Sequence, residues 1–390
     1  MPIINRIADF NADMTQWRQD IHQHPELGLE EHRTSALVAA LLHQFGVDEV
    51  HTGIATTGIV GVIHGTGPGE AIGLRADMDA LPIAEETGRD YASQTPGIMH
   101  ACGHDGHTAM LLGAARYLAE TRNFAGTVYV IFQPAEENAG GGQIMVQEGL
   151  FERFPMKQVF GMHNWPLAPA GTFLWRDGPI MAAVGNITIE ITGKGSHGAE
   201  PHLGTDPIVV ASAMVQSFQS IVSRNVQPVL GGVVSIGSIH GGFAHNVIPE
   251  TVRMLGTARW FEPEVGDTLE RSVLRLAHSI AEGYGAAAEA TFERLYPATV
   301  NDPAAMALGR QAAEIVSGEA RVKQLAMPTM AGEDFSFMLN AKQGAYIMIG
   351  SGTGHADAML HHPRYDFNDA ILPVGASYWA TLAENLLPRA

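Results

Sequence analysis

The chain has 390 residues, of which 46% are hydrophobic and 16% charged, and its formal net charge is −18. This composition is that of an ordinary globular protein, and the length predicts two domains. The negative charge argues against nucleic acid or an anionic membrane as a partner, because both are negatively charged themselves. It does not exclude an anionic small molecule, since a bound cation and one arginine can create a local positive site.

The location of the protein is suggested by its cysteine content and its apolar pattern. The single cysteine, Cys102, cannot form an internal disulfide, which favours a reducing compartment such as the cytoplasm. The N-terminal residues lack a charged stretch followed by a long apolar core, so we expect no signal peptide. No run of about 18 apolar residues occurs, so we expect no membrane span.

In the first half of the chain, predicted helices alternate with predicted strands. Apolar residues spaced by three and four predict helices over 12–23 and 30–45, with a Pro/Gly break at 24–28 between them. β-rich runs predict strands at 58–64, 71–77, 126–133 and 157–162, and a helix follows Asp105, its expected N-cap, over 105–120. This alternation predicts an α/β fold with a central, mostly parallel sheet flanked by helices.

The pattern changes near residue 184. Strands are predicted at 186–191, 229–239, 251–261 and 286–294, and helices at 206–223 and 264–283. The order β-α-β-β-α-β is typical of a ferredoxin-like α+β domain. We therefore expect an insert over 184–294 that interrupts a main domain formed by 1–183 and 295–390.

The segment 99–107 (MHACGHDGH) places Cys102 two residues before His104. A thiolate beside an imidazole suits a borderline-soft cation such as Zn²⁺. A lone cysteine is more often a small buried apolar side chain, and a nucleophilic thiol is a further alternative. The nucleophile is the weaker functional interpretation, because metal-type residues recur downstream and no thiol-protease motif surrounds Cys102.

Three more groups of metal-type side chains follow predicted strands. Asp77 and Asp79 come at the end of 71–77, Glu136 and Glu137 after 126–133, and His163 after 157–162. Ligands in open α/β sheets gather at the carboxyl ends of the strands, so we expect these groups to share one edge. We expect the adjacent side chains of Glu136 and Glu137 to point apart, so that one binds a metal and the other transfers a proton. Adjacent acids are also typical of a solvated corner, and Asp-x-Asp is typical of a capped turn.

Three loops offer further candidates. The segment 360–363 (LHHP) contains His361 and His362, at least one of which should face a site, although histidines are common in a chain that has 18 of them. The glycine-rich loop 193–198 (GKGSHG) could carry His197 to an active site or could be a simple turn. The segment 246–249 (NVIP) predicts a loop before a strand.

Five segments together resemble a known family: 77–82 (DMDALP), 100–105 (HACGHD), 133–137 (QPAEE), 161–163 (GMH) and 360–363 (LHHP). In this order, and across essentially the whole chain, they are similar to the amidohydrolase branch of the aminoacylase/glutamate-carboxypeptidase-like metallopeptidases. That branch includes hippurate hydrolases and the plant auxin–amino-acid conjugate hydrolases. The combination is specific, whereas each segment alone is a weak signal.

The resemblance implies a site for two divalent metal ions. The implied ligands are Cys102, His104, Glu137, His163 and His361. Glu136 would be the general base, and Asp79 would orient the metal site from behind. Many members of the wider family have His-x-Asp where this chain has Asp77-Met78-Asp79, and this branch replaces that histidine with the Cys102 thiolate. Zn²⁺, Mn²⁺, Ni²⁺ or Co²⁺ could fill such a mixed sulfur, nitrogen and oxygen site.

The insert resembles the lid and dimerisation domain of the family. Its His197 would stabilise the tetrahedral oxyanion in the partner subunit's site. Asn246 and Arg259 match lid positions that contact substrate, the arginine being suited to a carboxylate. The resemblance therefore implies a homodimer, or an oligomer built from dimers, that acts on a small molecule.

These observations predict hydrolysis of an N-acyl amino acid, of hippurate or N-acetyl type, to a carboxylic acid and a free amino acid. A dipeptidase or carboxypeptidase of the same family is the main alternative. A catalytically silent protein that binds metal or amino acids is the alternative from another class, and the pair Glu136 and Glu137 argues against it because a binding protein needs no base.

Overall fold

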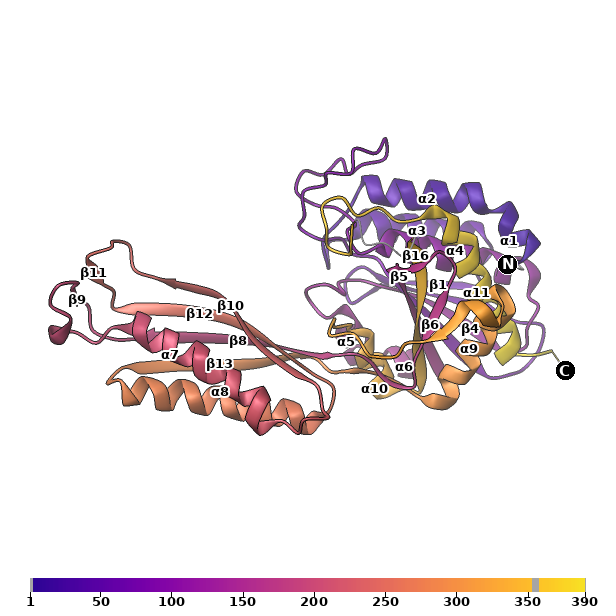
Figure 1. Cartoon of the computed structure of the whole chain (residues 1–390). Helices are drawn as coiled ribbons and strands as arrows, with labels where there is room; N and C mark the ends of the chain where they lie inside the picture. The colour runs from indigo at the N-terminus through magenta and orange to yellow at the C-terminus, as the bar shows by residue number, and fades with distance from the viewer. Residues whose placement is uncertain (1–2, 353–357, 390) are drawn as a thin grey trace. The chain divides into compact units, whose positions relative to one another are not determined.

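The computed structural model describes residues 3–352 and 358–389. Its backbone forms two compact units (Figure 1). The first unit consists of Met1–Ile180, Thr299–Pro328 and Asp334–Ala390, and the second of Met181–Ala298 and Thr329–Glu333. The segment 184–294, predicted as an insert, therefore falls inside the second unit.

The first unit is built on an eight-stranded sheet with the order β1-β2-β4-β3-β5-β16-β6-β15. The strands are β1 (Glu49–Ile54), β2 (Gly58–His64), β3 (Ala71–Asp77), β4 (Thr127–Gln133), β5 (Gln158–Pro169), β6 (Phe173–Trp175), β15 (Val322–Gln324) and β16 (Gly344–Gly352). The pairs β4–β3, β3–β5, β5–β16 and β6–β15 are parallel. The short strands β7 (Gly178–Met181) and β14 (Thr299–Asn301) form a separate sheet.

Helices cover this sheet and bury its apolar strands. They are α1 (Asn5–Asp9), α2 (Asn11–Gln23), α3 (His32–Gln44), α4 (His104–Thr121), α5 (Gly141–Gln147), α6 (Leu150–Arg153), α9 (Pro303–Ser317), α10 (Phe335–Ala341) and α11 (Leu372–Leu386). Strands β2, β3 and β4 are buried almost throughout, as expected for strands covered on both faces. Helix α4 is buried over most of its length because α2 and α11 pack beside it. The predicted α/β architecture, with a mostly parallel sheet between helices, is confirmed.

Strand β5 is longer than predicted, so the prediction that His163 follows the end of a strand is wrong. Pairing with β3 ends at Gly161, but pairing with β16 continues to Pro169. His163 therefore lies inside β5, beside Met348 of β16. A partner strand almost 200 residues away sets this length, and local sequence does not reveal it.

The expected N-cap of α4 is also wrong. The helix begins at His104 and its N-cap is Gly103, whose φ of 93° lies in the left-handed region. A side chain at Gly103 would place its Cβ 2.6 Å from Asn164 Oδ1, so only glycine fits there. Asp105 lies in the first turn, and its carboxylate serves a different purpose.

That carboxylate belongs to a buried charged cluster that joins three parts of the first unit. Asp105 Oδ2 lies 2.8 Å from Nδ1 of His22 on α2, and Glu85 Oε1 lies 3.3 Å from Nε2 of the same ring. One turn earlier on α2, the fully buried Arg18 donates to both oxygens of Asp369 at 2.7 and 2.8 Å. The cluster therefore ties α2 to the start of α4 and to the C-terminal segment.

The second unit has a four-stranded antiparallel sheet with the order β10-β12-β8-β13. Its elements are β8 (Ala183–Thr192), α7 (Pro207–Ser220), β10 (Gly232–Gly241), β12 (Thr251–Trp260), α8 (Pro263–Gly283) and β13 (Ala287–Tyr296). Both helices pack on the sheet over a core that includes Ile189, Met214 and Leu269. The element order β-α-β-β-α-β is ferredoxin-like. No helix in the described part of the chain is both long and apolar enough to cross a membrane.

The buried cluster on α2 predicts a loss of stability at alkaline pH. Burial alone would lower the pKa of His22, but Asp105 and Glu85 raise it from 6.5 to about 9. Because the pKa is raised on folding, the stabilisation is complete below pH 6.5 and disappears as the pH rises through about 9. The free energy of unfolding should fall by up to about 3 kcal/mol across this window, and this fall should be smaller in His22→Gln. Denaturant titrations at several pH values measure it, with His43→Gln at an exposed histidine as the control. The same fall in both variants would contradict the assignment.

Candidate metal centre

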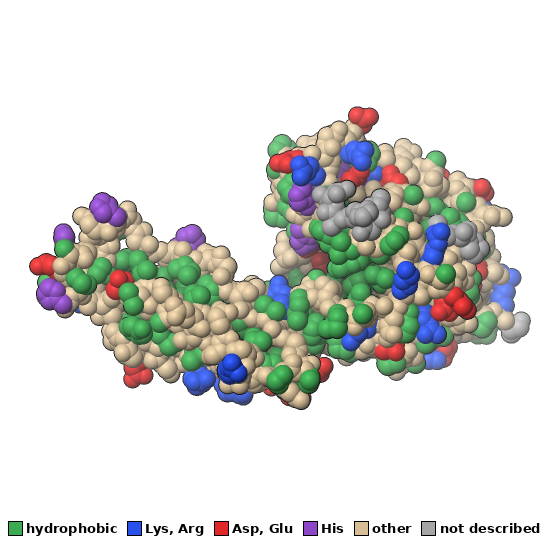
Figure 2. Space-filling model, viewed as in Figure 1, with side chains coloured by type: hydrophobic (Ala, Val, Ile, Leu, Met, Phe, Trp, Pro, Cys, Tyr) green, Lys and Arg blue, Asp and Glu red, His purple; other side chains and the backbone are tan. Residues whose placement is uncertain are grey.

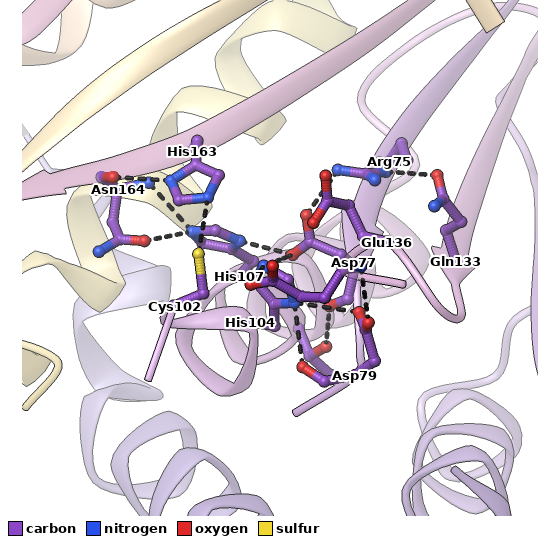
Figure 3. A network of polar contacts seen from close by, with 12 residues as sticks. Arg75, Asp77, Asp79, Cys102, His104, His107, Gln133, Glu136, His163 and Asn164 are labelled. Atoms are coloured by element: carbon purple, nitrogen blue, oxygen red, sulfur yellow. Dashed lines mark hydrogen bonds and ion pairs between the residues drawn. The ribbon is translucent and has the colours of Figure 1, made fainter. Parts of the chain in front are cut away.

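Five side chains with metal-binding atoms converge in the first unit, and Cys102, His104 and His163 among them are labelled in Figure 3. Cys102 Sγ lies 3.4 Å from His163 Nε2, and Glu137 Oε1 lies 3.9 Å from His104 Nε2 and 3.1 Å from His361 Nε2. Two groups have ligand atoms within 4.8 Å of one another, Cys102 with His104 and His163, and Cys102 with Glu137 and His361. The two groups share the sulfur, so all five residues surround one small volume.

These side chains come from four segments of the fold. Cys102 and His104 flank the left-handed turn at the start of α4, and Glu137 follows β4. His163 projects from β5 next to the end of its pairing with β3. His361 stands in the C-terminal segment with a φ of 65°, and its N–H donates to the carbonyl of Ala101 at 2.8 Å. The chain thus brings these residues together beside the carboxyl end of β4 and the point where β5 stops pairing with β3.

Asp79 orients two of the five residues at once. Its Oδ1 lies 3.1 Å from His104 Nδ1, and its Oδ2 accepts the backbone N–H of Glu137 at 2.9 Å. A histidine that donates through Nδ1 presents Nε2 as a ligand. His104 Nε2 therefore faces the shared volume, and Asp79 holds the loop of Glu137 beside it.

The side chains of Glu136 and Glu137 do not point apart as predicted. One carboxylate oxygen of each lies within 4.8 Å of the other and of a ring nitrogen of His104. The alternation rule applies to extended strands, whereas here Ala135 has a φ of 52° and the chain turns before the two glutamates. Both carboxylates therefore face the same volume.

The donor atoms and their electrostatics fit a divalent cation. His104 Nε2 and Glu137 Oε1 are buried, and neither makes a hydrogen bond within the described residues. Burial and the carboxylates of Glu137, Glu136 and Asp77 hold the pKa of the Cys102 thiol well above its usual value. A cation at this place would pair with the two unsatisfied atoms and favour the thiolate, as metals do when they bind cysteine.

The charge on the two buried histidines differs. Burial alone would lower the pKa of His104, but Asp77, Asp79 and Glu137 raise it to about 10. Burial and the neighbouring His107 hold the pKa of His163 well below its usual value. The neutral ring of His163 is therefore ready to ligate, whereas His104 must release a proton before it can bind a cation.

Several residues around the site were not assigned a role from the sequence. His107 Nδ1 lies 2.6 Å from Asp77 Oδ1, and its Nε2 lies 2.7 Å from Asn164 Oδ1. Arg75 donates to the other oxygen of Asp77 at 2.6 Å. Asp77 therefore holds the ring of His107, which is not among the five proposed ligands. The sequence signals for this network are that His107 lies in the segment 99–107 and that Asp77 stands at the end of a predicted strand.

The remaining site candidates lie in the second unit. His197 is on β9 (Ser196–His197), which pairs with β11 (Val247–Ile248) directly after Asn246. Asn246 O accepts the N–H of Gly198 at 2.7 Å, so these two candidates are neighbours. Arg259 lies near the far end of β12, where it pairs in register with Val184, and it donates to the carbonyl of Ala258 at 2.9 Å.

The sequence comparison agrees with this geometry. The model of peptidase family M20/M25/M40 matches residues 73–385. The chain belongs to this family. Among its M20 relatives, the hippurate hydrolase of Campylobacter jejuni is 40% identical over 98% of this chain and 99% of that protein. The N-acetyl-L-cysteine deacetylase of Bacillus subtilis is 39% identical over 93% of this chain and 85% of that protein.

A solved structure of the M20 family has the same fold. The YxeP protein of Bacillus subtilis, described as a dinuclear metal-binding peptidase of this family, is 34% identical to the chain. The alignment covers 97% of this chain and 99% of that structure, with a TM-score of 0.83. The similarity thus extends over both units.

The site predicts that Cys102→Ser loses metal. Mutation of a residue that only orients a ligand typically lowers metal affinity by about 10–100-fold. Loss of the thiolate itself should therefore lower the affinity by about a hundredfold or more. Elemental analysis after dialysis against a chelator, and the unfolding midpoint with and without Zn²⁺, measure this effect. His362→Ala is the control, because that ring accepts the N–H of Arg364 at 3.0 Å and lies outside the cluster. Unchanged metal content in Cys102→Ser would remove the sulfur from the ligand set.

Proposed function

We propose that the protein hydrolyses the amide bond of N-acyl amino acids, giving a carboxylic acid and a free amino acid. The observation that carries this proposal is a carboxylate beside the metal-type cluster, Glu136, within 4.8 Å of ligand atoms of His104 and Glu137. The relatives named hippurate hydrolase and N-acetyl-L-cysteine deacetylase support the substrate class.

Two divalent metal ions are the proposed cofactors, supported by the dinuclear relative. Cys102, His104, Glu137, His163 and His361 would hold them, and the mixed donors allow Zn²⁺, Mn²⁺, Ni²⁺ or Co²⁺. Such ions, when bound, polarise the acyl carbonyl and make water a stronger acid. Asp79 keeps Nε2 of His104 directed at the site throughout.

Glu136 is the proposed general base. It is only 6% exposed, and its Oε1 lies 3.4 Å from the backbone N of Asp334. From this position it would take the proton of the attacking water and then deliver it to the leaving nitrogen. A residue that accepts and returns one proton in this way is typical of amide hydrolysis by activated water.

His197 is the proposed donor to the oxyanion, acting in the site of the partner subunit. Its Nδ1 accepts the N–H of Ala199 at 3.0 Å, so the neutral ring carries its proton on Nε2. His197 is an exposed residue, as a donor to a developing oxyanion must be before the substrate arrives. The neighbouring Asn246 would contact the substrate, and Arg259 would bind a carboxylate.

A homodimer through the second unit is part of the same proposal. Strand β10 is an edge of its sheet and leaves backbone groups unpaired, which favours pairing with another strand. Large apolar side chains are exposed on and near this edge, among them Ile239 at 48% and Phe243 at 88%. Hydrophobic side chains are visible on the face of the second unit that Figure 2 shows. Together with Ile208 and Val209 of α7, they are suited to a protein interface. The lone cysteine favours a cytoplasmic location for the dimer.

A dipeptidase or carboxypeptidase activity is the alternative that the family name suggests. A panel of N-benzoyl and N-acetyl amino acids beside free dipeptides separates the two, because a dipeptidase needs the free α-amino group. Activity that survives chelation but is lost on alkylation would instead indicate Cys102 as a nucleophile. Metal binding without turnover of any amide would indicate a binding protein.

Glu136→Gln should abolish turnover and leave metal binding intact. Removal of a general base costs about 10²–10⁴-fold, and the amide keeps the size of the side chain. The measurement is kcat on benzoyl- and acetyl-amino acids together with metal content. Glu137→Gln is the matched comparison, because it should lose metal as well as activity. Near wild-type kcat in metal-loaded Glu136→Gln would exclude Glu136 from the mechanism.

The dimer proposal predicts that two inactive variants restore each other. In a mixed dimer of Glu136→Gln and His197→Ala, one of the two sites would combine an intact Glu136 with an intact His197 of the partner. Mixing the variants under conditions of subunit exchange should therefore regain activity, which a continuous assay follows. If each His197 acted within its own subunit, no activity would return. A monomer in sedimentation analysis would exclude the arrangement altogether.

A further inference from the structure

Glu31 is a fully buried carboxylate that the mechanism above does not use. It is the N-cap of α3, three residues after the Pro/Gly break at 24–28, and the sequence places it only inside the helix predicted over 30–45. Its Oε1 accepts the backbone N–H of Ala135 at 2.8 Å, and its Oε2 accepts the hydroxyl of Thr57 at 2.6 Å. The side chain therefore reaches the turn that precedes the two glutamates of the site.

The turn at Ala135 needs external support. Its φ of 52° is rarely adopted by a residue with a side chain and costs of the order of 1–3 kcal/mol. Gly28 packs directly against it, since a Cβ there would lie 2.8 Å from Ala135 Cβ and 2.5 Å from Asn138 Oδ1. The segment 28–31 therefore packs closely against the 135–138 turn at Gly28 and forms a hydrogen bond to it through Glu31.

Two buried carboxylates hold the backbone on either side of Glu136. Glu31 accepts the N–H of Ala135, and Asp79 accepts the N–H of Glu137 at 2.9 Å. The peptide group between Pro134 and Ala135 and the peptide group between Glu136 and Glu137 are therefore both fixed. Asp79 also orients His104, so the two fixed points align the base with a proposed ligand.

We propose that Glu31 is a positioning residue for the hydrolytic reaction. By holding the Ala135 peptide it keeps the 135–138 turn in its left-handed form and the Glu136 carboxylate beside His104 and Glu137. This inference rests on the proposed role of Glu136 as the general base. Glu31 acts only through the turn, because its carboxylate contacts Thr57 and the backbone.

The cost of burying this carboxylate supports a positioning role. Burial raises the pKa of Glu31 to about 7, although the hydrogen bonds from Thr57 and Ala135 lower it. Apolar side chains would fill the same space without this penalty. They would leave the N–H of Ala135 unsatisfied and would not fix the direction of its peptide.

The test compares four variants of the metal-loaded full chain. Glu31→Ala removes the contact, and Glu31→Asp keeps the charge but is one methylene too short to reach Ala135. Glu31→Gln keeps the length, and its amide can accept from Ala135 while it donates to the Thr57 oxygen. Glu26→Ala is the matched control, because that carboxylate likewise accepts two hydrogen bonds, here from the backbone N–H groups of Arg33 and Thr34, and no hydrogen bond among the described residues joins it to the turn.

We expect Glu31→Ala and Glu31→Asp to lower kcat by about 10²-fold, the effect of a misplaced group, with little change in KM. Hydrogen exchange of the 130–142 segment, measured by mass spectrometry, should become faster in both variants. Glu31→Gln should restore kcat and slow exchange. Glu26→Ala should lose stability but keep kcat and the exchange rate of this segment. If Glu31→Ala does not fold, Glu31→Asp and Glu31→Gln carry the same comparison.

Three results would overturn the inference: a wild-type kcat in Glu31→Asp, unchanged exchange in the 130–142 segment, or an equal loss of kcat in Glu26→Ala. These outcomes differ from failure of the proposed function. In that case the unmodified, metal-loaded protein would hydrolyse none of the N-acyl amino acids. The exchange rates would still show whether Glu31 holds the turn.

Discussion

The carboxylate of Asp79 is the contact on which the metal centre depends. One oxygen fixes the ring of His104, and the other fixes the backbone of Glu137, so a single buried side chain joins the start of α4 to the loop after β4. Asp79 itself stands two residues beyond the end of β3, and its position is therefore set by the sheet. The geometry of the site is in this way tied to the central sheet.

The buried carboxylates next to the centre are paired with cationic and hydrogen-bonding groups. Arg75 is fully buried and donates to Asp77 at 2.6 Å, and Asp77 in turn contacts His107. Arg75 and Gln133 both donate to Asp334, whose other oxygen accepts the N–H of Gly142 at 2.7 Å. This arrangement keeps the carboxylates of Asp77 and Asp334 paired, whereas Glu137 and Cys102 face the volume proposed for a cation.

The sequence predicts the parts of the fold that local pattern determines. The runs at 58–64 and 71–77 coincide with β2 and β3, because a strand buried on both faces is apolar throughout. The extent of β5 was not predictable, since a strand from the other end of the chain defines it. The motifs named the residues that converge, but the shared orientation of Glu136 and Glu137 depends on the unusual φ of Ala135. His107 contacts a residue 30 positions away in the chain, and Glu31 contacts one 104 positions away. No local sequence pattern predicts such contacts.

The proposed ligands are spread along the chain, from Cys102 to His361 near the C-terminal end. Contacts between such distant residues form late, because closing a long loop is entropically unfavourable. During synthesis the N-terminal part of the sheet can assemble while His361 is still inside the ribosome. A complete set of donors therefore exists only after the segment of His361 has joined the start of α4. Binding of a cation by all five donors thus requires that the first unit has folded.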